Sequence, residues 1–235
     1  AGYSIAQSLQ AEINGYGAAE SNAQTAVSVL QTAQGAINAQ ESILQQANTI
    51  ATQAANSTTA GNATAAAADQ QEFASLINQL DQIASSTTYA GVSLLSSSTA
   101  VLTFQVGPQA SAADAVAVNL TATSSGALGV ALTGTGAVAV NTVGSATAAM
   151  TAVQSAINTL ASFAAALGSS QNQIQALSNN VTVAQQNLTS AHADLVDVNV
   201  ASATSQFTSL QILEQSGISV LSQAQQLPQL ALKLI

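Results

Sequence analysis

Seven apolar residues, each seven positions after the last, dominate the second half of this 235-residue sequence. They are Val153, Leu160, Leu167, Ile174, Val181, Leu188 and Leu195. The positions three residues after each of these are mostly small or apolar, so the two rows together form the a/d seam of a coiled coil. A long helix of this kind is stable only where its apolar stripe is covered. The series therefore predicts a long helix with a helical partner.

The N-terminal part of the chain supplies a candidate partner. Leu30, Ile37 and Leu44 also recur every seven residues, within a helical pattern that runs from residue 3 to about residue 56. Gly15 and Gly17 predict a break or kink in this helix. A second helix is expected over 65–85, after a turn rich in Ser, Thr and Gly. Pairing of these helices with the C-terminal seam brings distant ends of the chain together.

Between residues 100 and 140 the hydrophobic period changes to two. Apolar residues alternate over 102–106, before a Gly107-Pro108 turn signal, and again over 116–120. Val138 and Val140 suggest a third short strand. We expect these strands to form a small β region at the far tip of the paired helices.

These patterns predict a mainly α fold with a small β region, in which long antiparallel coiled-coil helices carry a β-hairpin excursion. We divide the chain into an N-terminal helical half (1–99), a β-hairpin region (100–145), a C-terminal helical half (146–200) and a C-terminal helix (201–235).

The C-terminal helix carries a second heptad series without an obvious partner in the chain. Its members are Leu213, Val220, Leu227 and Leu234. Each Leu or Val side chain left in water forgoes roughly 1.5–3 kcal/mol. We therefore expect this tail to be disordered alone and to fold when other subunits cover it.

Charge and cysteine content exclude several classes of function. The chain has ten acidic residues, a single basic residue (Lys233), one histidine and no cysteine. One lysine cannot neutralise a row of phosphates, which argues against binding to nucleic acid or to an anionic membrane. No thiol chemistry and no multi-histidine metal site is available. No run approaches the ~20 apolar residues of a membrane span, and residues 1–10 do not form a signal peptide.

The only group that resembles acid–base machinery is His192 with Asp194 and Asp197. Asp194 lies two positions from the histidine and so points to another helix face, and no nucleophile accompanies them. A solvent-facing histidine on a coiled coil is the favoured interpretation. We expect no enzyme activity, no catalytic residue, no cofactor and no metal.

Short motifs along the chain resemble bacterial flagellin. SNAQ (21–24), QTAQGA (31–36) and IATQAANST (50–58) resemble its N-terminal half, and TYAGVSLL (88–95) its segment before the β region. TFQVG (103–107) and ALG (127–129) resemble the β region, LG (167–168) with QNQI (171–174) the start of the C-terminal helix, and ILEQSG (212–217) with QAQQLPQ (223–229) the carboxyl end. The resemblance covers nearly the whole chain in order.

The resemblance implies a structural subunit that polymerises with copies of itself into the extracellular flagellar filament used for motility. Such proteins leave the cell without a cleaved signal peptide, through the flagellar type III export apparatus. An export chaperone, a cap protein and hook-associated proteins are the implied partners. The helix at 201–235 corresponds to the inner tube. The family's variable outer domains have no counterpart between the two helical halves, so a thin filament is expected. The family's amino-terminal arm, which pairs with the carboxyl tail, would precede Ala1.

Gln46, Ile50 and Glu72 correspond to the surface that an animal innate-immune receptor recognises in some members of the family. Gln46 stands where an arginine is common, and the loss of a planar bidentate donor is not conservative. We expect recognition by that receptor to be weak or absent. The natural role of these residues would be contact between neighbouring subunits.

Two other interpretations stay open. A hook–filament junction protein would share the terminal helices but would be present in few copies. A secreted adhesin that reuses the scaffold would bind its ligand as a monomer, although an aromatic content of 3% argues against a sugar-binding platform.

The scarcity of charge suggests tolerance of acid. Ten carboxylates with ordinary pKa values of about 3.9–4.3 are mostly neutral near pH ~2, and few ion pairs exist for acid to break. The simpler alternative is that sparse charge only favours close packing or export.

Overall fold

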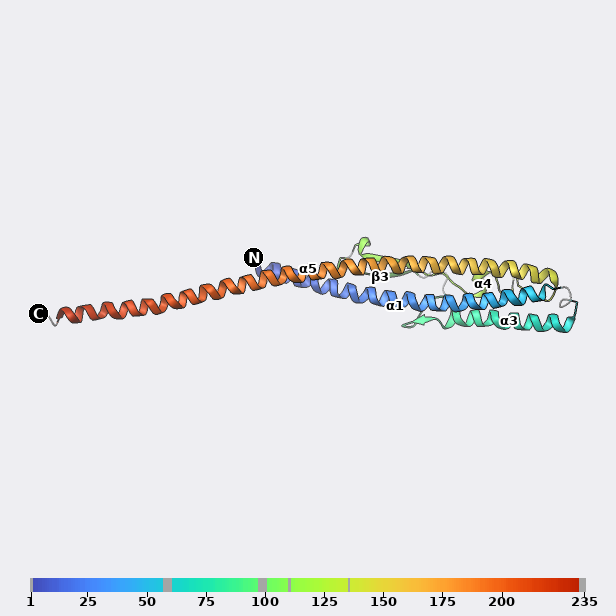
Figure 1. Cartoon of the computed structure of the whole chain (residues 1–235), viewed down its shortest axis with the longest axis horizontal. Coiled ribbons are helices and arrows are strands. Elements are labelled where there is room, and N and C mark those ends of the chain that lie inside the picture. Colours follow the sequence, from blue (N-terminus) through green and yellow to red (C-terminus); the bar gives the residue numbers. More distant parts are fainter. Residues whose placement is uncertain (1, 57–60, 97–100, 110, 135, 233–235) are drawn as a thin grey trace. The chain divides into compact units, whose positions relative to one another are not determined.

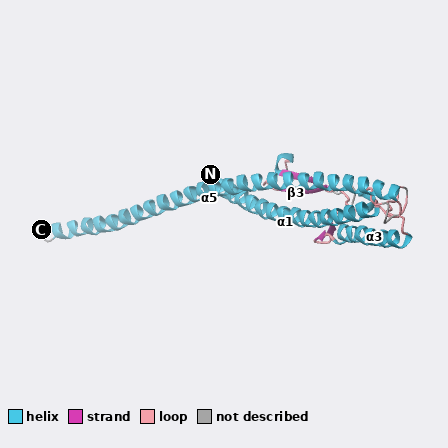
Figure 2. Cartoon of the chain, turned by 45° about the vertical axis from the view of Figure 1, so that its right-hand side comes forward, coloured by secondary structure: helices cyan, strands magenta, loops and turns pink. Residues whose placement is uncertain are grey.

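The computed structural model describes residues 2–56, 61–96, 101–109, 111–134 and 136–232, without the side chains of 198, 199 and 225–232. Its elements, in chain order, are α1 (Gly2–Ala54), α3 (Ala63–Ser86), β1 (Thr88–Tyr89), β2 (Val92–Ser93), β3 (Val101–Gln105), the 3-10 helix η1 (Ala112–Asp114), β4 (Ala115–Asn119), α4 (Ser125–Leu128) and α5 (Val143–Leu232) (Figures 1 and 2). The predicted fold class, mainly α with long helices and a small β region, is confirmed.

The chain divides into two compact units. One is formed by Gly15–Thr182, and the other by Ala1–Asn14 with Val183–Ile235. Helices α1 and α5 each contribute to both units, because the boundaries fall inside them. The four-part division given above stays a prediction.

The core of the Gly15–Thr182 unit lies between α1, α3 and α5. The three helices contribute many apolar side chains that are at most 1% exposed, among them Leu30, Ile37 and Leu44 from α1, Phe73, Ile77 and Leu80 from α3, and Val153, Leu160, Leu167 and Ile174 from α5. Helices α1 and α5 run antiparallel, since one groove is lined by Glu20 beside Thr182 and by Val27 beside Gln175. The seams predicted from heptad spacing thus supply much of this core.

Helix α3 has clear end signals. The Asn62 side chain accepts hydrogen bonds from the backbone N–H groups of Thr64 (3.1 Å) and Ala65 (3.3 Å), as an N-cap does. At the other end the Thr87 N–H donates to the Ile83 carbonyl (3.0 Å). The helix therefore begins two residues before the predicted start and ends one residue after the predicted end.

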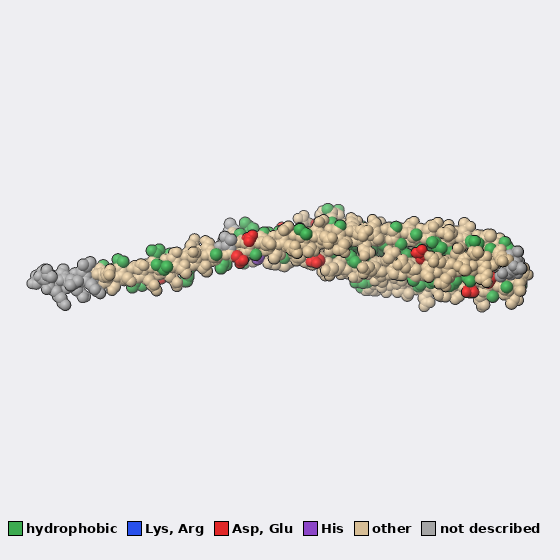
Figure 3. Space-filling view, viewed as in Figure 1, with side chains coloured by type: hydrophobic (Ala, Val, Ile, Leu, Met, Phe, Trp, Pro, Cys, Tyr) green, Lys and Arg blue, Asp and Glu red, His purple; other side chains and the backbone are tan. Residues whose placement is uncertain are grey.

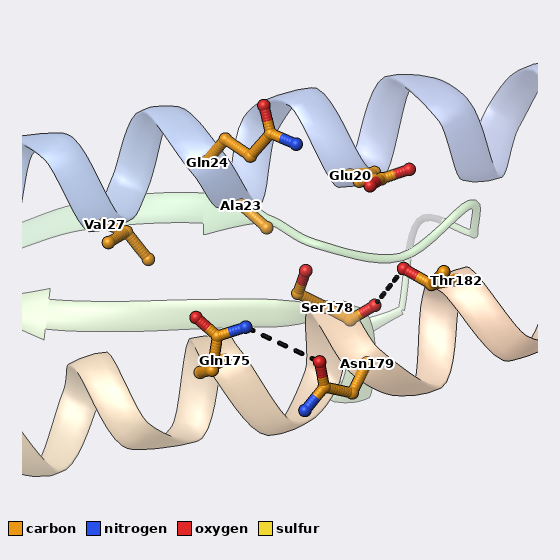
Figure 4. Close-up of a pocket in the computed structure, with 8 residues that line it drawn as sticks. All are labelled: Glu20, Ala23, Gln24, Val27, Gln175, Ser178, Asn179 and Thr182. Atoms are coloured by element: carbon orange, nitrogen blue, oxygen red, sulfur yellow. Dashed lines mark hydrogen bonds between the residues drawn. The ribbon is translucent and has the colours of Figure 1, made fainter.

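The β3–β4 hairpin lies alongside α1, so its predicted position at the far tip of the helices is wrong. The strands are antiparallel, with Val101 opposite Asn119 and Gln105 opposite Ala115. The Asn22 side chain of α1 donates to the Gln105 carbonyl (3.1 Å), and Figure 4 shows the strands behind α1 and α5. The apolar side chains of the strands are covered more completely against the side of a helix than at its end, which explains the position of the hairpin.

Helix α1 continues through Gly15 and Gly17, so the predicted break is wrong. Gly15 has a packing role instead. A Cβ added there would lie 3.2 Å from the Pro108 Cβ, so glycine lets the turn after β3 approach α1 closely.

The predicted third strand is also wrong. Val138 and Val140 are buried, but both lie in irregular structure. The Val140 N–H donates to Oε1 of Gln70 on α3 (2.7 Å), so a helix side chain takes the place of a partner strand. The two-residue strands β1 and β2 form a small hairpin that hydrophobic spacing did not predict.

Helix α5 runs to Leu232, which contradicts the predicted disorder of the tail. The difference follows from helix cooperativity, because a tail that extends an existing helix avoids the unfavourable nucleation step. Helix α5 is also long and apolar enough to cross a membrane, since the mean hydropathy of one of its segments reaches 1.2. Core helices of soluble proteins meet the same criterion of length and composition. Its stripe from Val153 to Val181 is buried within this chain.

Candidate assembly surface

Burial along the α5 heptad series falls steadily toward the C-terminus. Val153 is fully buried, Val181 is 5% exposed, and Leu188 and Leu195 are half-buried. Farther on, Leu213 is 67% and Val220 65% exposed. The side chain of Leu227 and the whole of Leu234 lie outside the described residues. One helix therefore carries both a covered stripe and an uncovered one.

The uncovered part is a broad face, which we name the C-terminal apolar face. It consists of Phe207, Leu210, Leu213, Ile218, Val220 and Leu221, each 60–67% exposed. At about 100° per residue these side chains share an arc of about 160° of the helix circumference. Ile212, which is 64% exposed, lies outside this face on the other side of the helix. Figure 3 shows hydrophobic side chains along this part of the chain. An arc of this width is wider than a single coiled-coil seam and can contact more than one neighbouring helix.

Hydroxyl groups around this face bond back to their own helix. Thr204 Oγ1 donates to the Val200 carbonyl (3.0 Å), Thr208 Oγ1 to the Thr204 carbonyl (3.1 Å), and Ser209 Oγ to the Ser205 carbonyl (2.9 Å). Their hydrogen-bonding needs are thus partly met before any partner arrives. Covering the face then leaves fewer polar groups without a partner.

A polar groove lies between α1 and α5 in the Gly15–Thr182 unit (Figure 4). Its volume is about 370 Å³, and its lining residues are Glu20, Ala23, Gln24 and Val27 from α1 with Gln175, Ser178, Asn179 and Thr182 from α5. Gln175 Nε2 donates to Asn179 Oδ1 (3.5 Å), and Thr182 Oγ1 donates to the Ser178 carbonyl (3.0 Å). The groove offers amides, hydroxyls and a single carboxylate, without a base poised on a nucleophile.

Neutral amide pairs recur on the helix surfaces. In each pair a Gln Nε2 donates to the Oδ1 of an Asn four residues later: Gln10–Asn14 (3.1 Å), Gln34–Asn38 (3.3 Å), Gln154–Asn158 (3.4 Å) and Gln175–Asn179 (3.5 Å). Helices commonly place Glu–Lys ion pairs at this spacing. Here uncharged groups stabilise the helix locally in the same way. Acid does not protonate them and salt does not screen them.

Partly and fully buried polar contacts fix the segment after β4 on the helices. Asp81 of α3 accepts from the backbone N–H of Ser125 (2.6 Å) and from its hydroxyl (2.7 Å). Gln40 of α1, fully buried, donates to the carbonyls of Leu80 and Thr123 (both 3.2 Å). Heptad reasoning missed both contacts, because it follows only apolar positions. Gln40 lies four residues before Leu44 and therefore falls on the same side of α1. This position indicates a polar group within the apolar seam.

Replacing Asp81 with asparagine should lower the free energy of unfolding by about 1.5–3 kcal/mol, because Asp81 accepts two hydrogen bonds as a charged group. Thermal unfolding followed by circular dichroism measures the change. Glu41→Gln is the matched control, since among the described residues the carboxylate of Glu41 accepts from Gln45 on its own helix, and the amide oxygen can still accept. Equal melting temperatures for the two variants would contradict the assigned role of Asp81.

The three residues of the expected contact surface do not share one environment. Gln46 and Glu72 are exposed, whereas Ile50 is 9% exposed and belongs to the core. The expectation that Ile50 lies on the surface is wrong for this chain, since it falls one heptad after Ile43 on the buried side of α1. His192 is half-buried, and Asp194 and Asp197 are exposed.

Comparison with known proteins accounts for this arrangement. The family models described as the bacterial flagellin N-terminal helical region and C-terminal helical region match residues 1–100 and 150–235. The chain belongs to the bacterial flagellin family. The flagellin of Bacillus subtilis is 32% identical to it over 260 residues, covering 100% of this chain and 86% of the relative. The flagellin of Halalkalibacterium halodurans is 30% identical, covering 100% of this chain and 84% of the relative.

The structural comparison agrees. The crystal structure of Bacillus cereus flagellin matches this flagellin with a TM-score of 0.57 and 25% sequence identity, over 68% of this chain and 88% of the other. This flagellin is therefore a structural subunit of the bacterial flagellar filament, which lies outside the cell and is built by self-polymerisation.

Proposed function

We propose that this flagellin is the main subunit along the length of the filament, and that copies bind one another through the C-terminal apolar face. The observation that carries the proposal is the change along α5 from a buried stripe to a face whose large side chains are 60–67% exposed. Transfer of each such side chain out of water contributes roughly 1.5–3 kcal/mol. Contacts of this size stabilise an assembly without ion pairs.

The arc of the face supports contact with several neighbours. An apolar helix surface of about 160° is too wide for one partner helix, whose seam covers a narrower stripe. Packing among several copies covers it. The exposed residues Gln46 and Glu72 are proposed as further subunit contacts on the other unit. Export through the flagellar type III apparatus, with a chaperone and under a cap protein, completes the proposal by resemblance to the family.

Leu213→Asp tests the proposed contact. The substitution places a charge within the face and should raise the critical concentration for polymerisation by at least about 100-fold, because the carboxylate would be buried in an apolar contact. Sedimentation of polymer and negative-stain microscopy measure the effect. Ser219→Asp, on the opposite side of the helix and less than two turns away, is the matched control and should shift the critical concentration much less.

Three outcomes would contradict the proposal. Equal effects of Leu213→Asp and Ser219→Asp would show that general repulsion, not the face, governs assembly. Antibody labelling confined to the base of the filament, instead of its whole length, would favour a hook–filament junction protein. Ligand binding by a monomer that never polymerises would favour an adhesin.

A further inference from the structure

Glu214 lies inside the C-terminal apolar face. At about 100° per residue its side chain leaves the helix between the directions of Phe207 and Leu221, and it is exposed. The residues one turn away on either side are Leu210, Gln211, Gly217 and Ile218, none of which can be ionised. The face thus has one titratable group, and that group is surrounded by apolar or neutral neighbours on its own helix.

Charged partners for Glu214 are scarce. The other titratable groups of the same unit are Tyr3, Glu12, His192, Asp194 and Asp197, and Lys233 lies outside the described residues. Asp197, the first of these before Glu214 along α5, is about 25 Å away at about 1.5 Å per residue. The sequence has no arginine and one lysine. A second copy of the chain therefore brings mainly carboxylates to the face, and its basic groups are Lys233, His192 and the terminal amino group.

We propose that Glu214 takes up a proton when copies of the chain cover the C-terminal apolar face, so that polymerisation is favoured by acid. This inference rests on the proposed function. An ionised carboxylate transferred from water into an apolar contact loses its hydration, whereas the protonated carboxyl loses far less. The step moves one proton from water to a carboxylate oxygen, and no other reactant is needed.

The sign of the pH dependence follows from proton linkage. The assembled subunit binds one more proton than the free one, so the assembly equilibrium strengthens as pH falls. With full uptake of one proton per subunit, the critical concentration should fall about tenfold for each pH unit between pH 7 and pH 5. Contacts built on ion pairs respond in the opposite direction, because acid removes their negative partners.

The experiment measures the critical concentration of polymerisation at pH 7, 6 and 5, for the unmodified full-length protein and for Glu214→Gln. The glutamine is neutral at every pH and nearly the same size. We expect it to lower the critical concentration at pH 7 by at least about tenfold and to flatten the pH profile. Glu12→Gln, which removes an exposed carboxylate from the same unit, is the matched control and should leave the slope almost unchanged.

The outcomes separate this inference from the proposed function. Parallel pH profiles for the unmodified protein and Glu214→Gln would overturn it, as would an assembly that weakens on acidification, the result expected if Lys233 of a neighbouring copy pairs with Glu214. Equal slopes for Glu12→Gln and Glu214→Gln would also overturn it, by showing that only net charge matters. Loss of polymerisation by Leu213→Asp at pH 7 would still support the proposed function in each of these cases.

Discussion

Phe73→Ala is expected to lower the free energy of unfolding by about 3–5 kcal/mol. Phe73 is fully buried on α3, within the cluster that joins α1, α3 and α5. Its removal leaves a cavity that close-packed neighbours fill only in part, so both transfer energy and dispersion contacts are lost. Chemical denaturation of the monomer below its critical concentration measures the change.

Phe207→Ala is the matched control for this substitution. The same side chain is removed, but Phe207 is 61% exposed on the C-terminal apolar face. The stability of the monomer should therefore change by less than about 0.5 kcal/mol, while polymerisation should weaken. If both variants destabilised the monomer equally, the division between a covered and an uncovered apolar surface would be wrong.

Leu160→Asp is expected to abolish folding of the Gly15–Thr182 unit at neutral pH. Leu160 lies in the middle of the buried seam and is fully buried, and a carboxylate there has no cation to pair with. Burial of an unpaired charge in a core lowers the free energy of unfolding by more than about 4 kcal/mol, which is a large fraction of the stability of a typical domain. Far-ultraviolet circular dichroism and limited proteolysis report the loss.

Leu160→Met separates the effect of charge from that of shape. The volume of methionine is close to that of leucine, so the substitution should lower the free energy of unfolding by less than about 1.5 kcal/mol. Acidification should partly restore the Leu160→Asp variant, because the protonated carboxyl is easier to bury. A folded Leu160→Asp protein at pH 7 would show that the seam is less tightly packed than its burial indicates.

The heptad spacing predicted the helical core well, for a physical reason. Period-seven residues such as Leu30 and Leu160 record which side of a helix is covered, and the structure buries them completely. Spacing along one helix also identified the uncovered residues Leu213 and Val220. It missed Phe207, Leu210, Ile218 and Leu221, because a broad face has no single period.

Contacts between distant segments could not be predicted in this way. The position of the β3–β4 hairpin depends on Asn22, which donates to a carbonyl 83 residues away, and on the close approach permitted by Gly15. Val138 and Val140 alternate like a strand, yet the side chain of Gln70 satisfies the backbone there. Alternating apolar residues indicate that one side of a segment is buried, but they do not specify which group forms hydrogen bonds with its backbone.

The partner of the α1 stripe comes late in the chain, and this has a consequence for folding kinetics. Helix α1 ends at Ala54, and α5 begins only at Val143. Bonds that fix the intervening segments span 70 to 83 residues, so large loops must close before the core gains its contacts, which slows folding. A chain synthesised or delivered from its N-terminus stays without a completed core until α5 has emerged, and during that interval the leucines of α1 stay accessible to whatever protein accompanies it.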